Sequence, residues 1–166
     1  IALAAAVVGI VTMGIAAKHH RESRRVEPIR DRVQADLFER LFSVDPDWEA
    51  WVESISRAEH RELEKLLEEY LRRLQGTEHA RLCDLAAALG IPARARDDLD
   101  SDDRRFRALT WLALLEEPIE PDRLEACCTD TPRHRAGAAR VLYRSGHADA
   151  AAAGTDILLG DGEQSL

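Results

Sequence analysis

His79 and Cys83 form the residue pair in this sequence that comes closest to a chemical site. They are four residues apart on an expected helix, so both side chains would lie on one face and could reach the same metal ion. Zinc usually takes four such ligands, and the other candidates are Cys127, Cys128 and His134. A partly buried cysteine beside a surface histidine is the simpler interpretation. We therefore expect no metal and no other cofactor.

Two further groups of side chains could carry chemistry. Cys127 and Cys128 could form a redox switch, although adjacent cysteines rarely close a disulfide on a regular backbone. The carboxylates of residues 97–103 could bind a cation, but arginines on both sides, including Arg96 and Arg104, oppose it. The sequence contains no glycine-rich phosphate loop, no nucleophile elbow and no HExxH helix. We expect a protein that is not an enzyme; a metal- or thiol-dependent enzyme is an alternative.

Trp48 and Trp51 are one helical turn apart, and two indole rings at that spacing could stack on a ligand or partner. The alternative is that they fill the end of a helical stack. Aromatic residues make up only 5% of the chain, so such a stack has few other large rings to use. We take the Trp48/Trp51 region as one part of a candidate interaction surface.

The elements that hold these residues are expected to be helices. Glycine and proline are few and fall between apolar runs, which is typical of an all-α chain. The clearest helix begins after Ser56, where Glu59 completes a capping box, and its leucines recur at three- and four-residue steps. Glu68 and Arg72 are spaced to form an ion pair along it. The polar residues 93–101 are expected to be a linker between helices.

Residues 1–17 carry no charged side chain and are long enough for a bilayer span, which needs about 17 to 25 residues. A cleaved signal peptide is the alternative, but such a peptide places its positive charges before the apolar run. Here the basic side chains come after it: Lys18, Arg21, Arg24 and Arg25. Because positive flanks stay on the cytoplasmic side, we expect a single-pass membrane protein with its C-terminal domain in the cytoplasm.

The net charge of −8 is distributed unevenly. Residues 18–32 carry more basic than acidic side chains, and residues 33–166 taken together are acidic. An acidic body repels phosphate backbones, so we expect no nucleic acid as a partner. The three cysteines lack the spacing of a disulfide framework, which favours a reducing compartment. The expected parts are a transmembrane helix (1–17), a basic juxtamembrane segment with an amphipathic helix (18–43), a helical-repeat domain (44–154) and a flexible acidic tail (155–166).

Two stretches of the expected repeat domain resemble each other at an offset of 28 positions. Asp102 then aligns with Asp130, and Arg107 aligns with Arg135. Each stretch has an acidic turn, then an arginine, then a helix rich in small apolar side chains. Small side chains let neighbouring helices approach closely, so stacked helix pairs can share one core.

The stretch "TDTPRHRAGAARVLYRSG" resembles the second helix of a HEAT-type repeat, with Asp130 in the turn, Arg135 early in the helix and Gly146 after it. "LDSDDRRFRALTWLALLEE" is similar, with Asp102 and Arg107 at the matching positions. The resemblance implies a short HEAT-like α-solenoid of antiparallel helix pairs. In that family the aspartate and the arginine are structural and tie one repeat's turn to the next.

The match covers residues 97–153, and the whole layout resembles prokaryotic membrane proteins with one N-terminal span and a cytosolic HEAT-like domain. Some of those proteins accompany membrane glycosyltransferases. We expect a membrane-anchored, non-enzymatic scaffold or adaptor whose partners are the lipid bilayer and other membrane or membrane-associated proteins, with no small-molecule substrate. The alternative is an accessory or regulatory subunit of a membrane enzyme complex, such as a glycosyltransferase, that packs through its transmembrane helix. The candidate interaction surface consists of Trp48, Trp51, Arg107 and Arg135.

Overall fold

The computed structural model describes residues 28–128, 130–146 and 150–159. Within these ranges the chain is all-helical and contains no strand, which confirms the expected fold class for this part of the protein. The first described helix covers residues 28–41. The helices after it are α2 (Trp48–Ser54), α3 (Arg57–Leu71), α4 (Thr77–Ala88), α5 (Ile91–Asp98), α6 (Asp102–Leu114), α7 (Pro121–Cys128), α8 (Pro132–Arg144) and α9 (Ala150–Leu159).

The expected N-terminal span and the expected C-terminal tail can each be compared with the described ranges. The expected span at residues 1–17 and its basic flank, Lys18, Arg21, Arg24 and Arg25, lie outside the described ranges. None of the helices inside these ranges combines the length and the apolar character needed to cross a membrane. At the other end, α9 continues to Leu159 and buries Ile157, so residues 155–159 are helical rather than part of a flexible tail.

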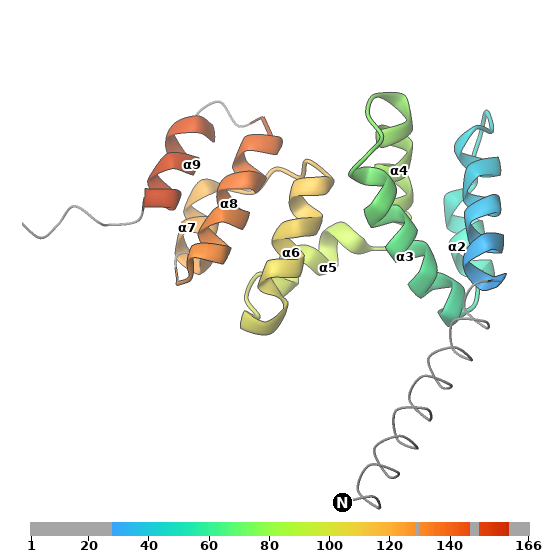
Figure 1. The fold of residues 1–166 in the computed structure, drawn as a ribbon, viewed down its shortest axis with the longest axis horizontal. Helices are drawn as coiled ribbons and strands as arrows, with labels where there is room; N and C mark the ends of the chain where they lie inside the picture. The colour runs from blue at the N-terminus through green and yellow to red at the C-terminus, as the bar shows by residue number, and fades with distance from the viewer. Residues whose placement is uncertain (1–27, 129, 147–149, 160–166) are drawn as a thin grey trace, which may run out of the picture.

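The helices follow one another along the long axis of the molecule in chain order (Figure 1). Each packs against helices close to it in sequence: α4 lies against α2 and α3, α5 lies beside α6, and α8 contacts α6, α7 and α9. The helix at 28–41 packs along α3, where the Phe38 and Tyr70 rings are 5.1 Å apart and Arg30 pairs with Glu69 at 2.8 Å.

Helix α3 begins with the predicted capping box and is stabilised by the predicted ion pair. The Ser56 hydroxyl accepts a hydrogen bond from the Glu59 backbone N–H, and the Glu59 carboxylate accepts one from the Ser56 N–H, so the predicted capping box is confirmed. Arg72 pairs with Glu68 at 2.6 Å, as its spacing predicted. The leucines of α3 face a single core that runs the length of the described chain.

Helix α5 lies where a polar linker was expected, so that prediction was wrong. Ile91 and Ala95 are one turn apart and both are buried, while the charged residues between and after them face solvent. Pro92 sits in the first turn, where its missing N–H costs nothing. Two turns with two apolar anchors are enough to form a packed helix, but they are too short to show a clear period in a charged stretch.

Helices α6 and α8 match residue by residue at an offset of 30 positions rather than 28. Their first residues are Asp102 and Pro132, and their last are Leu114 and Arg144. Both present the same buried positions to the core: Ala108, Leu109, Trp111 and Leu112 in α6, and Ala138, Ala139, Val141 and Leu142 in α8. Each is also followed, two residues after its end, by a residue with positive φ: Glu116 (55°) and Gly146 (66°). The two helices therefore have the same length and corresponding buried positions.

Candidate functional site

A groove lined by α6, α8 and the end of α3 combines apolar and charged side chains. Its deeper part, with a volume of about 260 Å³, lies between α6 and α8. Its floor consists of Phe106, Leu109, Thr110, Ala113, Leu114, Ala136 and Gly137, and its rim consists of Arg72, Arg133 and Arg140. We call this set of residues the arginine groove.

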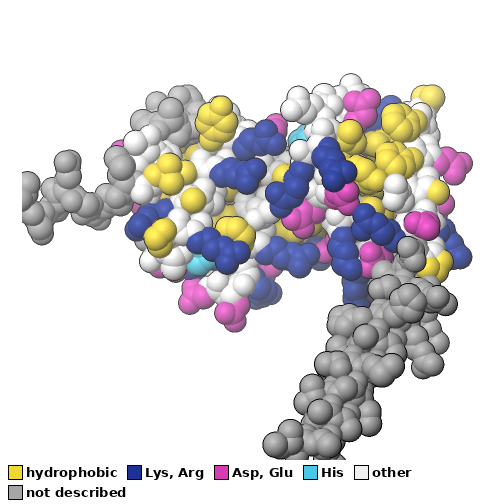
Figure 2. All heavy atoms as spheres, in the orientation of Figure 1, with side chains coloured by type: hydrophobic (Ala, Val, Ile, Leu, Met, Phe, Trp, Pro, Cys, Tyr) yellow, Lys and Arg dark blue, Asp and Glu magenta, His cyan; other side chains and the backbone are white. Residues whose placement is uncertain are grey.

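The arginine groove continues toward α3. A second hollow of about 560 Å³ shares Arg72, Phe106 and Thr110 with it and is also lined by Arg61, Glu64, Lys65, Glu68 and Arg107. Figure 2 shows Lys and Arg side chains gathered across the middle of the face that α3, α6 and α8 present, with hydrophobic side chains among them. In a chain of net charge −8, this face is locally basic.

Helix packing explains why the floor is both narrow and apolar. Gly137 faces Leu109, and a Cβ at Gly137 would lie 2.9 Å from the Leu109 Cδ1 atom. The absent side chain therefore lets α6 and α8 approach closely. Phe106 is half-buried beside them, and the Arg133 guanidinium lies 3.6 Å from the centre of its ring.

The rim arginines differ in how their charge is compensated. Arg72 is paired with Glu68 at 2.6 Å, and Arg107 lies 3.4 Å from Glu64. Arg133 has the Phe106 ring beneath it, and among the described residues neither Arg133 nor Arg140 has an acidic partner. The α8 side of the groove thus offers two cations to an incoming anionic group.

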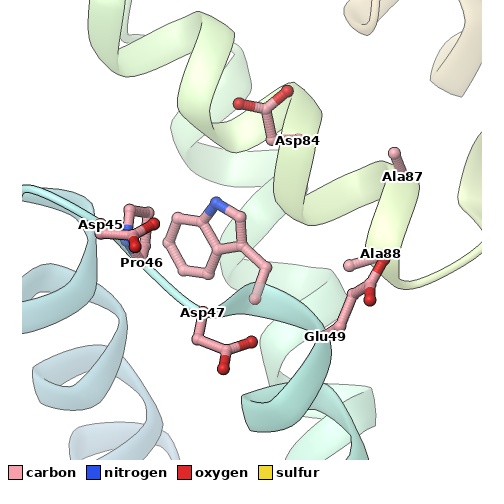
Figure 3. Close-up of a pocket in the computed structure, with 8 residues that line it drawn as sticks. Asp45, Pro46, Asp47, Glu49, Asp84, Ala87 and Ala88 are labelled. Atoms are coloured by element: carbon pink, nitrogen blue, oxygen red, sulfur yellow. The ribbon is translucent and has the colours of Figure 1, made fainter.

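Trp48 and Trp51 were expected as part of an interaction surface, but the structure buries both rings. Their exposed fractions are 7% and 4%, their ring centres are 6.0 Å apart, and the Arg40 guanidinium covers Trp51 at 4.8 Å. They therefore fill the core between α2 and its neighbours instead of presenting a stacking platform. An open hollow of about 500 Å³ lies beside Trp48 and is edged by Asp45, Pro46, Asp47, Glu49, Asp84, Ala87 and Ala88 (Figure 3).

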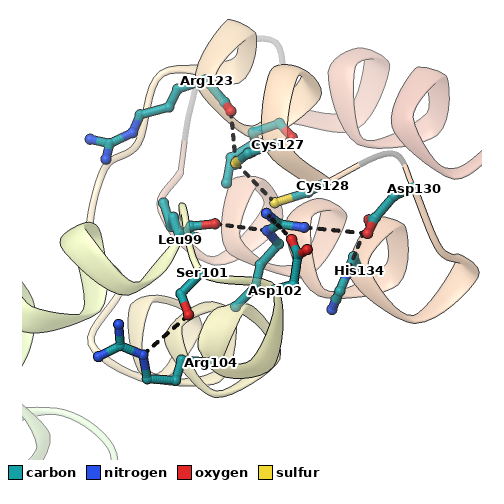
Figure 4. A network of polar contacts seen from close by, with 11 residues as sticks. Leu99, Ser101, Asp102, Arg104, Arg123, Cys127, Cys128, Asp130 and His134 are labelled. Carbon is teal, nitrogen blue, oxygen red and sulfur yellow. Dashed lines mark hydrogen bonds and ion pairs between the residues drawn. The ribbon is translucent and has the colours of Figure 1, made fainter.

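Arg105 forms the most connected polar contact in the described chain (Figure 4). Its guanidinium is buried, donates from Nε to the Leu99 carbonyl at 2.7 Å, and pairs with Asp102 at 2.8 Å and with Asp130 at 3.3 Å. His134 donates to the second Asp130 oxygen at 2.8 Å. The hydrogen bond from His134, with a smaller effect from the Arg105 charge, lowers the pKa of Asp130. This network joins the start of α6 to the turn before α8.

Arg107, the residue that sequence comparison placed in this role, does not take part. Its side chain is 67% exposed and reaches across to Glu64 on α3. Arg105 and Arg135 are the equivalent pair, because each lies four residues after its capping position, Ser101 or Thr131. Arg135 is half-buried. Alignment of α6 and α8 by their capping positions, rather than by identical residues, would have paired Arg105 with Arg135.

The histidine and cysteine side chains take up structural contacts. His79 donates from Nε2 to the Leu114 carbonyl at 3.0 Å, which ties α4 to the end of α6, and its Nδ1 lies 3.6 Å from Cys83 Sγ. Burial, with smaller contributions from nearby carboxylates, raises the pKa of Cys83 to about 11. The Cys127 and Cys128 sulfurs are 3.3 Å apart, and burial raises the pKa of Cys128. Within the described ranges, no three His, Cys, Asp or Glu side chains are placed to share a metal ion.

The arginine groove was not predicted from the sequence. Arg133, Ala136, Gly137 and Arg140 recur at three- and four-residue steps, and that spacing was the available signal for one exposed helix face. No protein-family model, curated protein or solved structure matches the chain. The function must therefore be inferred from the groove itself. Its lining supplies apolar contact area and fixed cations, which is the chemistry of binding.

Proposed function

We propose that this chain is a membrane-anchored, non-enzymatic scaffold whose cytoplasmic domain of HEAT-like helix pairs binds a partner protein in the arginine groove. The observation that carries the proposal is the groove, where apolar floor and arginine rim lie together on one face of α6 and α8. Aromatic and arginine side chains are the types that contribute most to protein interfaces.

The repeat part of the proposal is supported by the equivalence of α6 and α8. The preceding helices, α5 and α7, are also alike in length, and their first residues Ile91 and Pro121 are again 30 positions apart. Two helix pairs with the same 30-residue spacing, whose second helices bury corresponding positions, support a stacked repeat array. Such an array provides an extended surface, and the groove runs along it.

The membrane part of the proposal depends on the sequence. Residues 1–17 have the length and apolar character of a span, and the basic residues that follow favour a cytoplasmic domain. Anchoring would raise the local concentration of the domain for partners in the same membrane. Replacement of residues 1–17 by an unrelated span should preserve partner binding, whereas their deletion should release the chain from the membrane fraction.

A photo-crosslinking amino acid placed in the groove tests the interaction directly. Ala136 is suitable because it lines the groove and its side chain is exposed. Val44 is a matched control, since it is 97% exposed and lies in the turn after the first described helix. In cells of the source organism we expect a discrete protein adduct from position 136 and none of the same mass from position 44. Absence of that adduct, or the same adduct from both positions, would contradict the proposal.

A further inference from the structure

We infer that the occupant of the arginine groove is an acidic amphipathic helix of the partner protein, with its apolar side chains on the groove floor and its carboxylates on the rim. The inference rests on the proposed function, because it assumes that the groove is the docking site. It adds the chemical class of the segment that the groove accepts.

The form of the floor favours a helix. The α6 residues that line it are Phe106, Leu109, Thr110, Ala113 and Leu114, which recur at the three- and four-residue steps of one helix face. Ala136 and Gly137 form the facing row on α8. Rows with this spacing leave channels into which the side-chain ridges of another helix fit. The exposed Ala136 has only a methyl group, which leaves the channel beside it open.

The rim favours carboxylates. Arg133 and Arg140 lie on one face of α8, seven residues or about 10 Å apart along its axis. Acidic residues seven apart on a docked helix have the same separation, so both could be paired at once. Arginine is well suited to this, because its planar guanidinium binds a carboxylate through two parallel hydrogen bonds. Arg72, which is paired with Glu68 at 2.6 Å, lies on the opposite side of the floor.

The arrangement fits a protein segment better than a bilayer surface. Surface-bound proteins insert apolar side chains that protrude beyond their basic residues. Here the order is reversed, since the apolar floor is recessed and the Arg133 guanidinium covers Phe106. The strongly acidic remainder of the chain would also be repelled by an anionic membrane, whereas a short acidic helix meets only the local basic face.

The experiment measures binding of designed peptides to the full chain in nanodiscs of zwitterionic lipid, with empty nanodiscs as the blank. The probe is a fluorescent 18-residue helical peptide with leucines on one face and glutamates elsewhere. One comparison peptide has the same composition with its leucines scattered around the helix, and another has lysine in place of glutamate. We expect saturable binding of the probe that weakens with salt, and at least about tenfold weaker binding of both comparison peptides.

Variants locate the binding site. The double variant Arg133→Glu/Arg140→Glu should weaken probe binding at least about tenfold, and Ala136→Trp should do so by filling the groove without a change of charge. Arg32→Glu is the matched control, because Arg32 is 71% exposed on the 28–41 helix and its described ion pair with Glu59 is long, at 3.9 Å. It should bind the probe within about twofold of the unmodified chain. The circular dichroism spectrum of each variant should match that of the unmodified chain, which checks that the helices are retained.

Several outcomes would overturn the inference. They are equal binding of the lysine peptide, unchanged binding by the double variant, tighter binding to phosphatidylserine vesicles through the same arginines, and groove-dependent dimerisation in sedimentation. The proposed function fails separately, when crosslinking at Ala136 yields no partner. A partner that is captured there through a basic or uncharged segment would preserve the proposed function and overturn only this inference.

Discussion

The buried guanidinium of Arg105, in the first turns of α6, lies 3.3 Å from the carboxylate of Asp130 in the turn that precedes α8. The same guanidinium also satisfies the Leu99 carbonyl, at the end of α5. A single side chain thus connects the end of α5, the start of α6 and the turn between α7 and α8. Because a buried charge is costly without partners, the contact fixes where α6 begins relative to its neighbours.

Replacement of Arg105 by alanine should lower the free energy of unfolding by about 2–4 kcal/mol, because it leaves the Leu99 carbonyl and two carboxylates without their shared donor. Urea denaturation followed by circular dichroism measures the change. Arg107→Ala removes an exposed arginine from the same helix and should change stability by no more than about 0.5 kcal/mol. Equal effects of the two substitutions would show that Arg105 does not have this role.

Stability should depend on the ionisation of Asp130 in acid. Its pKa is lowered in the folded protein, so its contribution is present above the unfolded value of about 3.9 and is lost as the pH falls toward the folded value. Asp130→Asn should therefore lower Tm at pH 6, and this difference should shrink as the pH falls below about 3.9. Asp103→Asn, at an exposed position in the first turn of α6, serves as the control. A Tm difference for Asp130→Asn that persists unchanged to pH 3 would contradict this interpretation.

Cys83 should be slow to alkylate. With its pKa raised to about 11, the thiol is almost fully protonated at pH 8, and only the thiolate reacts. Peptide-resolved mass spectrometry after iodoacetamide treatment should show modification of Cys83 at least about tenfold slower in the native protein than in urea. Its rate should rise roughly tenfold per pH unit between pH 7 and 9. Rapid, pH-independent labelling of the native protein would exclude the buried, neutral thiol.

Gly90 follows α4 and Glu116 follows α6, and both have a positive φ, so substitutions at these positions should change the backbone strain. Gly90 has a φ of 66° with open space around it, so Gly90→Ala should cost about 1 kcal/mol from backbone strain alone. Glu116 has a φ of 55°, at the position where the equivalent helix has Gly146. Glu116→Gly should stabilise the protein by about 0.5 kcal/mol, after the loss of its long, 3.9 Å pair with Arg144. Thermal melts of the two variants should shift in opposite directions.

Short-range signals in the sequence predicted the local structure well. The capping box of Ser56 and Glu59 and the ion pair of Glu68 and Arg72 involve residues three or four positions apart, so the sequence contains both partners. The two-turn helix α5 was missed, because its apolar anchors are few and its other residues are charged.

The correspondence between α6 and α8 and the form of the groove depend on contacts between residues that are far apart in the sequence. Arg105 and Arg107 are both arginines early in α6, and only the packing of α5 and α8 decides which one is buried. Trp48 and Trp51 have the spacing of a stacking platform, but α4 packs against their helix. The groove arises where α6 and α8 meet, and the close contact of Gly137 with Leu109 is visible only once both helices are placed.

The positions of the three indoles, Trp48, Trp51 and Trp111, have a consequence for spectroscopy. All lie in α2 and α6, so tryptophan emission reports on the part of the molecule up to α6 and contains no direct signal from α7, α8 or α9. If the C-terminal helices melt first, fluorescence can report that event only through Trp111 in α6, the helix against which α8 packs. Circular dichroism reports the loss of every helix, so the two methods will give different midpoints for one sample.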